Sequence, residues 1–316
     1  MAPQTDIPVA ANVLGTIGTI LWCVQLVPQI WANWRTKKTD GLPASMMFLW
    51  AACGVPFGVY AIIQNFNIPI QVQPQCFGIL SIVAWVQILM YSQSDHNADT
   101  QPFVTNSNWP TWKATTLGVV VTLAFGGIEA ALILTLRVIY ERGNETPPMV
   151  VGIIASILLA AGLVPPYGEI WKRRGRVVGI NWVFLSMDCS GAFFSLMALV
   201  AQNTFDILGG VLYIICCALE LGIFTSHLIW LLRTRQVRRE AKAQGKTFDE
   251  LAAEYEASGE PFKFAERKSN KDLKKDPRSR ELSVLEAGCD SSNEASSREQ
   301  SDAEKQQAGS AGRVLP

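Results

Sequence analysis

The chain has 316 residues, of which 49% are hydrophobic, and its 27 basic residues balance 27 acidic ones. Residues 1–232 hold only 10 of the basic and 11 of the acidic residues, so an apolar body precedes a C-terminal tail dense in both charges. This distribution gives no basic face for nucleic acid. No His or Cys spacing suggests a metal site, and we expect neither a metal nor another cofactor.

Seven apolar windows are each long enough to cross a bilayer, whose hydrocarbon core is about 30 Å thick. Almost no charge lies inside them, and the loops between them are short. The windows lie at residues 10–32, 43–63, 72–92, 115–138, 149–171, 180–202 and 207–232. The sequence therefore predicts an all-α integral membrane protein with seven transmembrane helices.

Basic residues cluster after the first, fifth and seventh of these spans, at 35–38, 172–176 and 233–239. The N-terminus and the loops after the second and sixth spans carry no Lys or Arg. Under the positive-inside rule, this pattern predicts a lumenal N-terminus and a cytosolic C-terminus.

The first and fifth spans share a repeated motif. Leu-Val-Pro-Gln-Ile at residues 26–30 returns as Leu-Val-Pro-Pro-Tyr at residues 163–167. Each copy covers three spans, and the fourth span is the extra crossing that makes the two copies parallel. This 3+1+3 layout of triple-helix bundles gives four predicted regions. The last region is expected to begin as a polar helix over residues 233–257 and to be largely disordered. The regions are a first bundle at 1–92, a linker with the fourth span at 93–148, a second bundle at 149–232 and a cytosolic tail at 233–316.

Pro28 and Pro165 lie inside the first and fifth spans. Each removes a backbone donor and presses against the carbonyl four residues earlier. In hydrocarbon, such a kink persists where protein or a water-lined cavity satisfies that carbonyl. The duplicated prolines are therefore candidate hinges, and a structural bend is the alternative.

Three carboxyl groups lie within the spans, at Glu129, Asp188 and Glu220. A charged carboxylate in hydrocarbon is costly, so these groups are expected to face the bundle interior. No Lys or Arg lies between Arg176 and Arg233, which favours protonation of Asp188 and Glu220 over ion pairing. These carboxyls are candidate proton-coupling groups. The alternative is a neutral carboxyl held by hydrogen bonds in a packed core.

The motif formed by Pro28-Gln29, Asn33-Trp34-Arg35 and Gly41-Leu42 resembles that of the PQ-loop repeat family, which includes cystinosin-like and vacuolar amino acid transporters with the SWEET superfamily fold. The second copy departs from this pattern, because Pro166 stands where the family usually has glutamine. The resemblance implies a small polar cargo and a proton-coupling role for Asp188. Four residues are expected to contact cargo: Gln29, Asn33, Trp182 and Asp188.

We expect a transporter that exports an amino acid or similar metabolite, coupled to protons, from a vacuole or lysosome lumen to the cytosol. In this interpretation the two triple-helix bundles rock about the kinks by alternating access. The alternative is a non-transporting sorting receptor or scaffold that acts through a cytosolic partner of the tail. Residues 233–242 are expected near anionic lipid. No nucleophile–base pair is visible, so we do not expect an enzyme.

Overall fold

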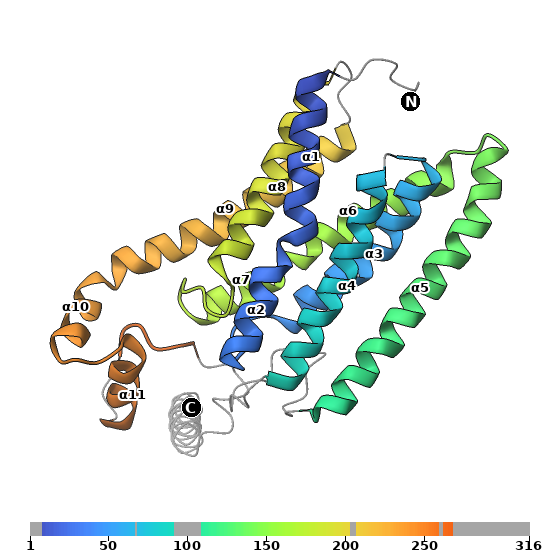
Figure 1. The fold of residues 1–316 in the computed structure, drawn as a ribbon. Coiled ribbons are helices and arrows are strands. Elements are labelled where there is room, and N and C mark those ends of the chain that lie inside the picture. The colour runs from blue at the N-terminus through green and yellow to red at the C-terminus, as the bar shows by residue number, and fades with distance from the viewer. Residues whose placement is uncertain (1–7, 67, 92–108, 203–206, 259–261, 268–316) are drawn as a thin grey trace, which may run out of the picture. The chain divides into compact units, whose positions relative to one another are not determined.

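The computed structural model describes residues 8–66, 68–91, 109–202, 207–258 and 262–267 (Figure 1). Over these residues the regular structure is entirely helical. The helices are α1 (Val9–Val24), α2 (Leu26–Thr36), α3 (Ala44–Ile63), α4 (Ile68–Tyr91), α5 (Thr111–Glu141), α6 (Thr146–Gly162), α7 (Pro165–Lys172), α8 (Trp182–Val200), α9 (Ile207–Arg233), α10 (Arg235–Ala243) and α11 (Phe248–Ser258).

Among the described residues, seven helical stretches are long and apolar enough to cross a membrane. The pairs α1–α2 and α6–α7 each form one of them, and α3, α4, α5, α8 and α9 supply the others. The predicted all-α, seven-span membrane fold is confirmed. The predicted disorder of the tail beyond residue 267 lies outside the described residues, and the boundaries between the four predicted regions stay predictions.

The first and fifth spans break ahead of their prolines. The break between α1 and α2 falls at Gln25, three residues before Pro28. The break between α6 and α7 directly precedes Pro165, and there the carbonyl of Ala161 accepts a hydrogen bond from the N–H of Val164 (3.1 Å). The proline rings oppose a regular helical turn at both places. Each span therefore consists of two helical segments.

The polar segment after the seventh span differs from the prediction of one helix over residues 233–257. It forms two helices, α10 and α11, with a turn between them. Gly245 in this turn has φ of 68°, a left-handed conformation that glycine adopts without steric cost and that ends α10.

Helices of each half pack against helices of the other half. The helix α1 packs along α8, and α3 packs along α6, so the first span of each half lies against the second span of the other. Small residues allow this close approach, since a Cβ on Gly18 of α1 would lie 3.0 Å from the carbonyl oxygen of Gly191 in α8. The helix α5 lies outside this exchange and packs mainly on α3 and α4 (Figure 1).

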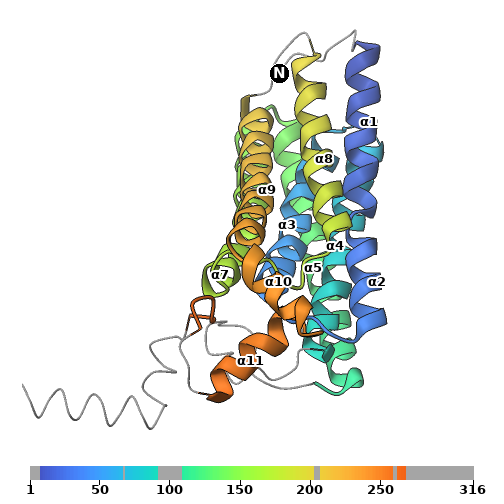
Figure 2. The same ribbon diagram turned by 90° about the vertical axis from the view of Figure 1, so that its left-hand side faces the viewer.

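The basic clusters at 35–38, 172–176 and 233–239 gather at one end of the bundle, which we call the basic end (Figure 2). Two loops meet there. A Cβ on Gly41 would lie 2.6 Å from the carbonyl oxygen of Val178, and a Cβ on Gly179 would lie 2.2 Å from that of Asp40. An offset of 138 residues converts either contact into the other. The halves are therefore related as parallel repeats. We call residues 40–42 with 178–181 the loop contact.

Candidate functional site

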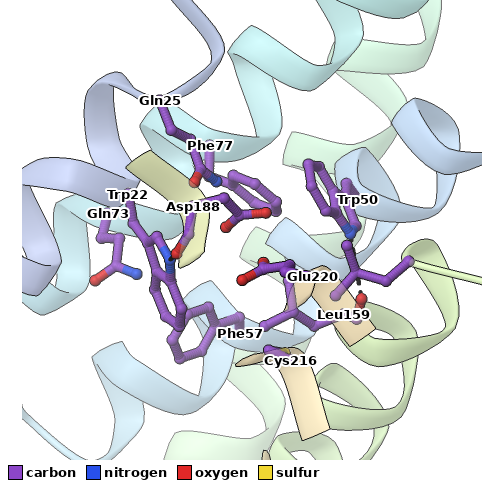
Figure 3. Close-up of a pocket in the computed structure, with 11 residues that line it drawn as sticks. Trp22, Gln25, Trp50, Phe57, Gln73, Phe77, Leu159, Asp188, Cys216 and Glu220 are labelled. Carbon is purple, nitrogen blue, oxygen red and sulfur yellow. Dashed lines mark hydrogen bonds between the residues drawn. The ribbon is translucent and has the colours of Figure 1, made fainter. Parts of the chain in front are cut away.

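A small cavity lies between the two halves, lined by side chains of both (Figure 3). Its volume is about 20 Å³, which is room for about one water molecule. The first half contributes mostly aromatic and amide side chains, and the second half contributes two carboxyls. The lining residues are Trp22, Gln25, Trp50, Phe57, Gln73, Phe77, Leu159, Leu163, Asp188, Cys216 and Glu220.

The carboxyls of Asp188 in α8 and Glu220 in α9 face each other across this cavity (Figure 3). Asp188 is 5% exposed and Glu220 is 1% exposed. Their side chains lie within hydrogen-bonding reach of each other, and the side chain of Gln25 lies within reach of Asp188. Sequence reasoning placed both carboxyls in the bundle interior, and the structure brings them together.

Neither carboxyl forms an ion pair with a basic side chain in the described part of the chain. If both carboxyls were ionised, their two negative charges would repel each other strongly, because little water screens buried groups. A shared hydrogen bond also requires a proton, because an ionised carboxylate only accepts. The arrangement of Asp188 and Glu220 therefore favours a proton shared between the two carboxyls over two ionised groups.

Three oxygens at the cavity have no hydrogen-bond partner among the described residues: Oε1 of Gln25, Oδ2 of Asp188 and Oε2 of Glu220. Buried polar atoms are normally paired. Gln25 occupies the break between α1 and α2, so the sequence feature that interrupts the helix also presents a polar side chain here. The cavity can thus accept hydrogen-bond donors from a polar ligand.

Two tryptophans fix the walls of the cavity in equivalent ways. The indole Nε1–H of Trp22 donates to the backbone carbonyl of Asp188 (3.1 Å), and that of Trp50 donates to the carbonyl of Leu159 (3.2 Å). Trp22 corresponds to Leu159 in the repeat, and Trp50 corresponds to Asp188, so the two contacts join equivalent pairs of positions with the donor and acceptor positions exchanged. Gly191 faces the ring of Trp22, where a Cβ would clash with the indole. The repeat therefore joins the halves on both sides of the cavity.

The glutamine of the first motif forms hydrogen bonds to residues of the loop contact. Gln29 is 1% exposed. Its Nε2 donates to Oδ1 of Asn33 (2.8 Å) and to the carbonyl of Gly179 (3.0 Å), and its Oε1 accepts from the N–H of Asn181 (2.7 Å). Asn33 in turn donates to Oε1 of Gln87 in α4 (3.1 Å). The motif of the first half therefore holds the chain entering α8 of the second half.

The held residue Asn181 also starts α8. Its side-chain oxygen accepts from the N–H groups of Val183 (2.8 Å) and Phe184 (3.3 Å), which is an N-cap. Asp188 lies seven residues further along the same helix, about 10 Å at 1.5 Å per residue. One helix thus connects the loop contact to the carboxyl pair.

The second motif lacks this arrangement. Pro166 occupies the position equivalent to Gln29 and is buried, but its side chain has no donor or acceptor. Among the described residues, the hydrogen bonds that a motif side chain makes across the loop contact come from Gln29 in the first half. The departure from the family pattern therefore makes the two halves unequal.

Three other predicted site residues lie away from the cavity. Glu129 of α5 accepts a hydrogen bond from the side-chain amide of Gln75 in α4, next to Gly58 of α3. Asn33 belongs to the loop contact network. Trp182 packs on His227, with ring centroids 4.7 Å apart, at the basic end. The structure therefore separates Gln29, Asn33 and Trp182 from Asp188.

Sequence reasoning missed several residues that line the cavity, among them Trp22, Gln25, Gln73 and Phe77. A signal was present for Gln25, which lies three residues before Pro28 and is a polar residue in an apolar span. The aromatic residues gave no signal, because interfacial anchoring explains most tryptophans in such a sequence.

The fold and the cavity define a multi-pass integral membrane protein with parallel repeats. Residues 10–70 match the PQ loop repeat family. The chain is 42% identical over 241 residues to an uncharacterized membrane protein of Saccharomyces cerevisiae, with 76% of this chain and 72% of that protein covered. It is 34% identical over 221 residues to an uncharacterized protein of Schizosaccharomyces pombe, with 70% and 72% covered. The chain belongs to the PQ-loop repeat family.

Proposed function

We propose that this protein is a proton-coupled transporter that exports an amino acid or a similar small polar metabolite from a vacuole or lysosome lumen to the cytosol. The observation that carries the proposal is the carboxyl pair of Asp188 and Glu220. Carboxyls inside a membrane are costly and usually mark proton or substrate pathways. This pair is enclosed between two repeats, which is where transporters with parallel repeats bind their cargo.

The proposed cycle is alternating access. The positive-inside rule assigns the basic end to the cytosol. The proposed cycle takes the conformation in which residues 40–42 touch residues 178–181 as the one closed toward that side. Protonation from an acidic lumen neutralises the carboxyl pair, and the helix breaks at Gln25 and before Pro165 provide the hinges. Opening separates residues 40–42 from 178–181 and releases proton and cargo.

The test is uptake into reconstituted vesicles with an imposed pH gradient, using a panel of labelled amino acids. We expect gradient-driven flux of one or more of them in the native protein and loss of that flux in Asp188→Asn and Glu220→Gln. Glu129→Gln is the informative companion, because Glu129 lies away from the cavity and bonds only Gln75 among the described side chains. Equal loss in all three variants would contradict a specific role for the pair.

A second candidate function is a sorting receptor or scaffold that acts through its C-terminal region. The observation that favours it is the attachment of α11 to the loop before α8, through Asp249 and Arg176. Binding of a cytosolic partner to residues 233–316, with no flux of any tested solute in either direction, would support this function over transport.

A further inference from the structure

The loops that meet at the loop contact are held differently on their outer sides. In the first half, the Nζ of Lys37 donates to the hydroxyl of Tyr91 (3.1 Å) and lies 5.1 Å from the ring centroid of Trp34. These partners belong to the same half. In the second half, the equivalent loop contacts a segment from beyond the seventh span. We call residues 248–258 and 262–267 the latch.

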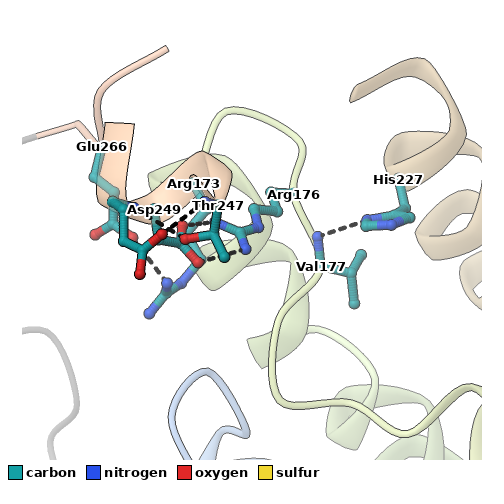
Figure 4. Close-up of polar contacts among 8 residues, drawn as sticks. Arg173, Arg176, Val177, His227, Thr247, Asp249 and Glu266 are labelled. Carbon is teal, nitrogen blue, oxygen red and sulfur yellow. Dashed lines mark hydrogen bonds and ion pairs between the residues drawn. The ribbon is translucent and has the colours of Figure 1, made fainter. Parts of the chain in front are cut away.

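Two half-buried arginines anchor the latch (Figure 4). Both terminal guanidinium nitrogens of Arg176 pair with the carboxylate of Asp249, and Arg173 pairs with Glu266 (2.8 Å). The arginine side chains are only 25% and 12% exposed. Arg176 and Asp249 form a bidentate pair, which is more directional than an ordinary surface ion pair, and the carboxylates of Asp249 and Glu266 are 66% and 44% exposed.

Backbone contacts add to these ion pairs. The N–H of Arg267 donates to the carbonyl of Lys172 (2.9 Å), and Nε of Arg174 donates to the carbonyl of Ala265 (2.6 Å). The guanidinium of Arg267 also lies 4.4 Å from the ring centroid of Trp171. The end of the latch therefore runs along residues 171–174 and binds them through main-chain as well as side-chain groups.

Aromatic rings seat the start of the latch. Phe248 meets Trp230 of α9 edge-on, with centroids 5.2 Å apart. The guanidinium of Arg176 lies 5.2 Å from the ring centroid of Trp230 and 5.4 Å from that of Phe248. Arg176 thus joins the latch and α9 to the same loop, through cation–π contacts as well as through its ion pair.

The loop leads from the latch directly to the loop contact. The N–H of Val177, next to Arg176, donates to Nδ1 of His227 (3.2 Å) (Figure 4). The following residues, Val178 and Gly179, are those that touch the loop of the first half. Any separation of residues 40–42 from 178–181 that moves the second loop must therefore strain or release the latch.

From this continuity we propose that the latch is an intramolecular restraint that keeps the loop contact closed, so that its release favours opening of the basic end. The latch controls access to the cavity from the basic end, and it does so by holding the loop of the second half. Its action requires no particular cargo, and it applies to a receptor as well as to a transporter.

The test measures access to Cys216, a buried cavity residue, in the full-length protein. A membrane-impermeant methanethiosulfonate is added on the side of the basic end, and modification of Cys216 is quantified by peptide mass spectrometry. We expect Asp249→Ala to raise the modification rate about fivefold, the effect of about 1 kcal/mol on a conformational equilibrium. Glu240→Ala is the matched control, since it removes one exposed carboxylate from α10 outside the latch.

Two further measurements complete the test. Exchanging the charges, with Arg176→Glu and Asp249→Lys together, restores an ion pair without the cation–π contacts of Arg176, and it is expected to bring the rate part of the way back to the native value. Hydrogen exchange of residues 173–181 reports whether the latch has been released. Faster exchange in Asp249→Ala without faster modification of Cys216 would overturn the proposal, and so would no change in either. Because neither readout involves flux, failure of the transport assay leaves this test unaffected.

Discussion

The two halves of the repeat share a backbone plan but differ in what they bring to the cavity and to the basic end. The first half supplies Trp50 where the second supplies Asp188, and Gln29 where the second has Pro166. The carboxyl pair therefore belongs to the second half, and the amide that closes the loop contact belongs to the first. Duplication therefore provided a common scaffold, and each copy then acquired its own polar side chains.

The largest expected effect follows from removing the ionisable group of the second half. Asp188→Asn should abolish pH-gradient-driven flux, a loss of about 100-fold or more, because a positioned proton-transfer group contributes at least that much. Flux in reconstituted vesicles is the measurement. Trp50→Phe, at the equivalent position of the first half, should keep the coupling to protons. Flux that survives in Asp188→Asn and still follows the pH gradient would break the proposed division between the halves.

The amide of the first half gives the next effect. Gln29→Ala should lower the free energy of unfolding by about 3 kcal/mol, because it leaves the N–H of Asn181 and the carbonyl of Gly179 without their buried partner. Pro166→Ala removes no hydrogen bond at the equivalent position and should cost less than about 1 kcal/mol. Thermal unfolding of the purified variants measures both. Equal losses would mean that the halves contribute equally to the loop contact.

The two glycines of the loop contact, unlike Gln29 and Pro166, are expected to contribute equally. Gly41 and Gly179 have φ of 83° and 81°, and a Cβ on either would collide with the backbone of the other loop. Gly41→Ala and Gly179→Ala should therefore each destabilise the protein by about 2 kcal/mol, from backbone strain and displacement of the opposite loop. Chemical denaturation in detergent can compare them. If the two variants lose unfolding free energies that differ by more than about 1 kcal/mol, the two glycines do not contribute equally to stability.

The smallest effect concerns pH at the latch, which contacts the loop of the second half at residues 171–176. The hydrogen-bonded guanidinium of Arg176 lowers the pKa of Asp249 from its ordinary value. A lowered pKa means that the pair stabilises the folded latch above the unfolded pKa, about 3.9 for aspartate, and that this stability is lost as pH falls through the folded pKa. Spin-label distances between α11 and the loop at 173–177 should therefore be unchanged between pH 7 and pH 5. Detachment within that range would contradict the ion pair.

Much of the fold could be predicted from local sequence properties. Span length, hydropathy and the repeated proline motif indicated seven helices in parallel repeats, because bilayer thickness and proline sterics act on short segments. The split of the polar segment into α10 and α11 was missed, although Gly245 is a helix-ending residue. That turn depends on the seating of α11 against the loop before α8, which is a tertiary contact.

The candidate site was predicted less completely, for a physical reason. The need to bury charge in a membrane indicated that Asp188 and Glu220 face inward. It could not indicate that they face each other, or that Glu129 would bond Gln75 in α4 instead. Gln29 was expected to contact cargo, but its partners come from about 150 residues further along the chain. Local patterns carry no information about pairings at that separation.

The hydrogen bonds between the first span and α8 determine which helices move together in the proposed cycle. Trp22 holds α8 at the level of Asp188, and Gln29 holds its first residue at the basic end. Because Trp22 lies in α1, ahead of the break at Gln25, α1 and α8 move together in the proposed cycle. The moving bodies in that cycle are mixed pairs, α1 with α8 and α3 with α6, so each copy of the repeat shears internally when the basic end opens.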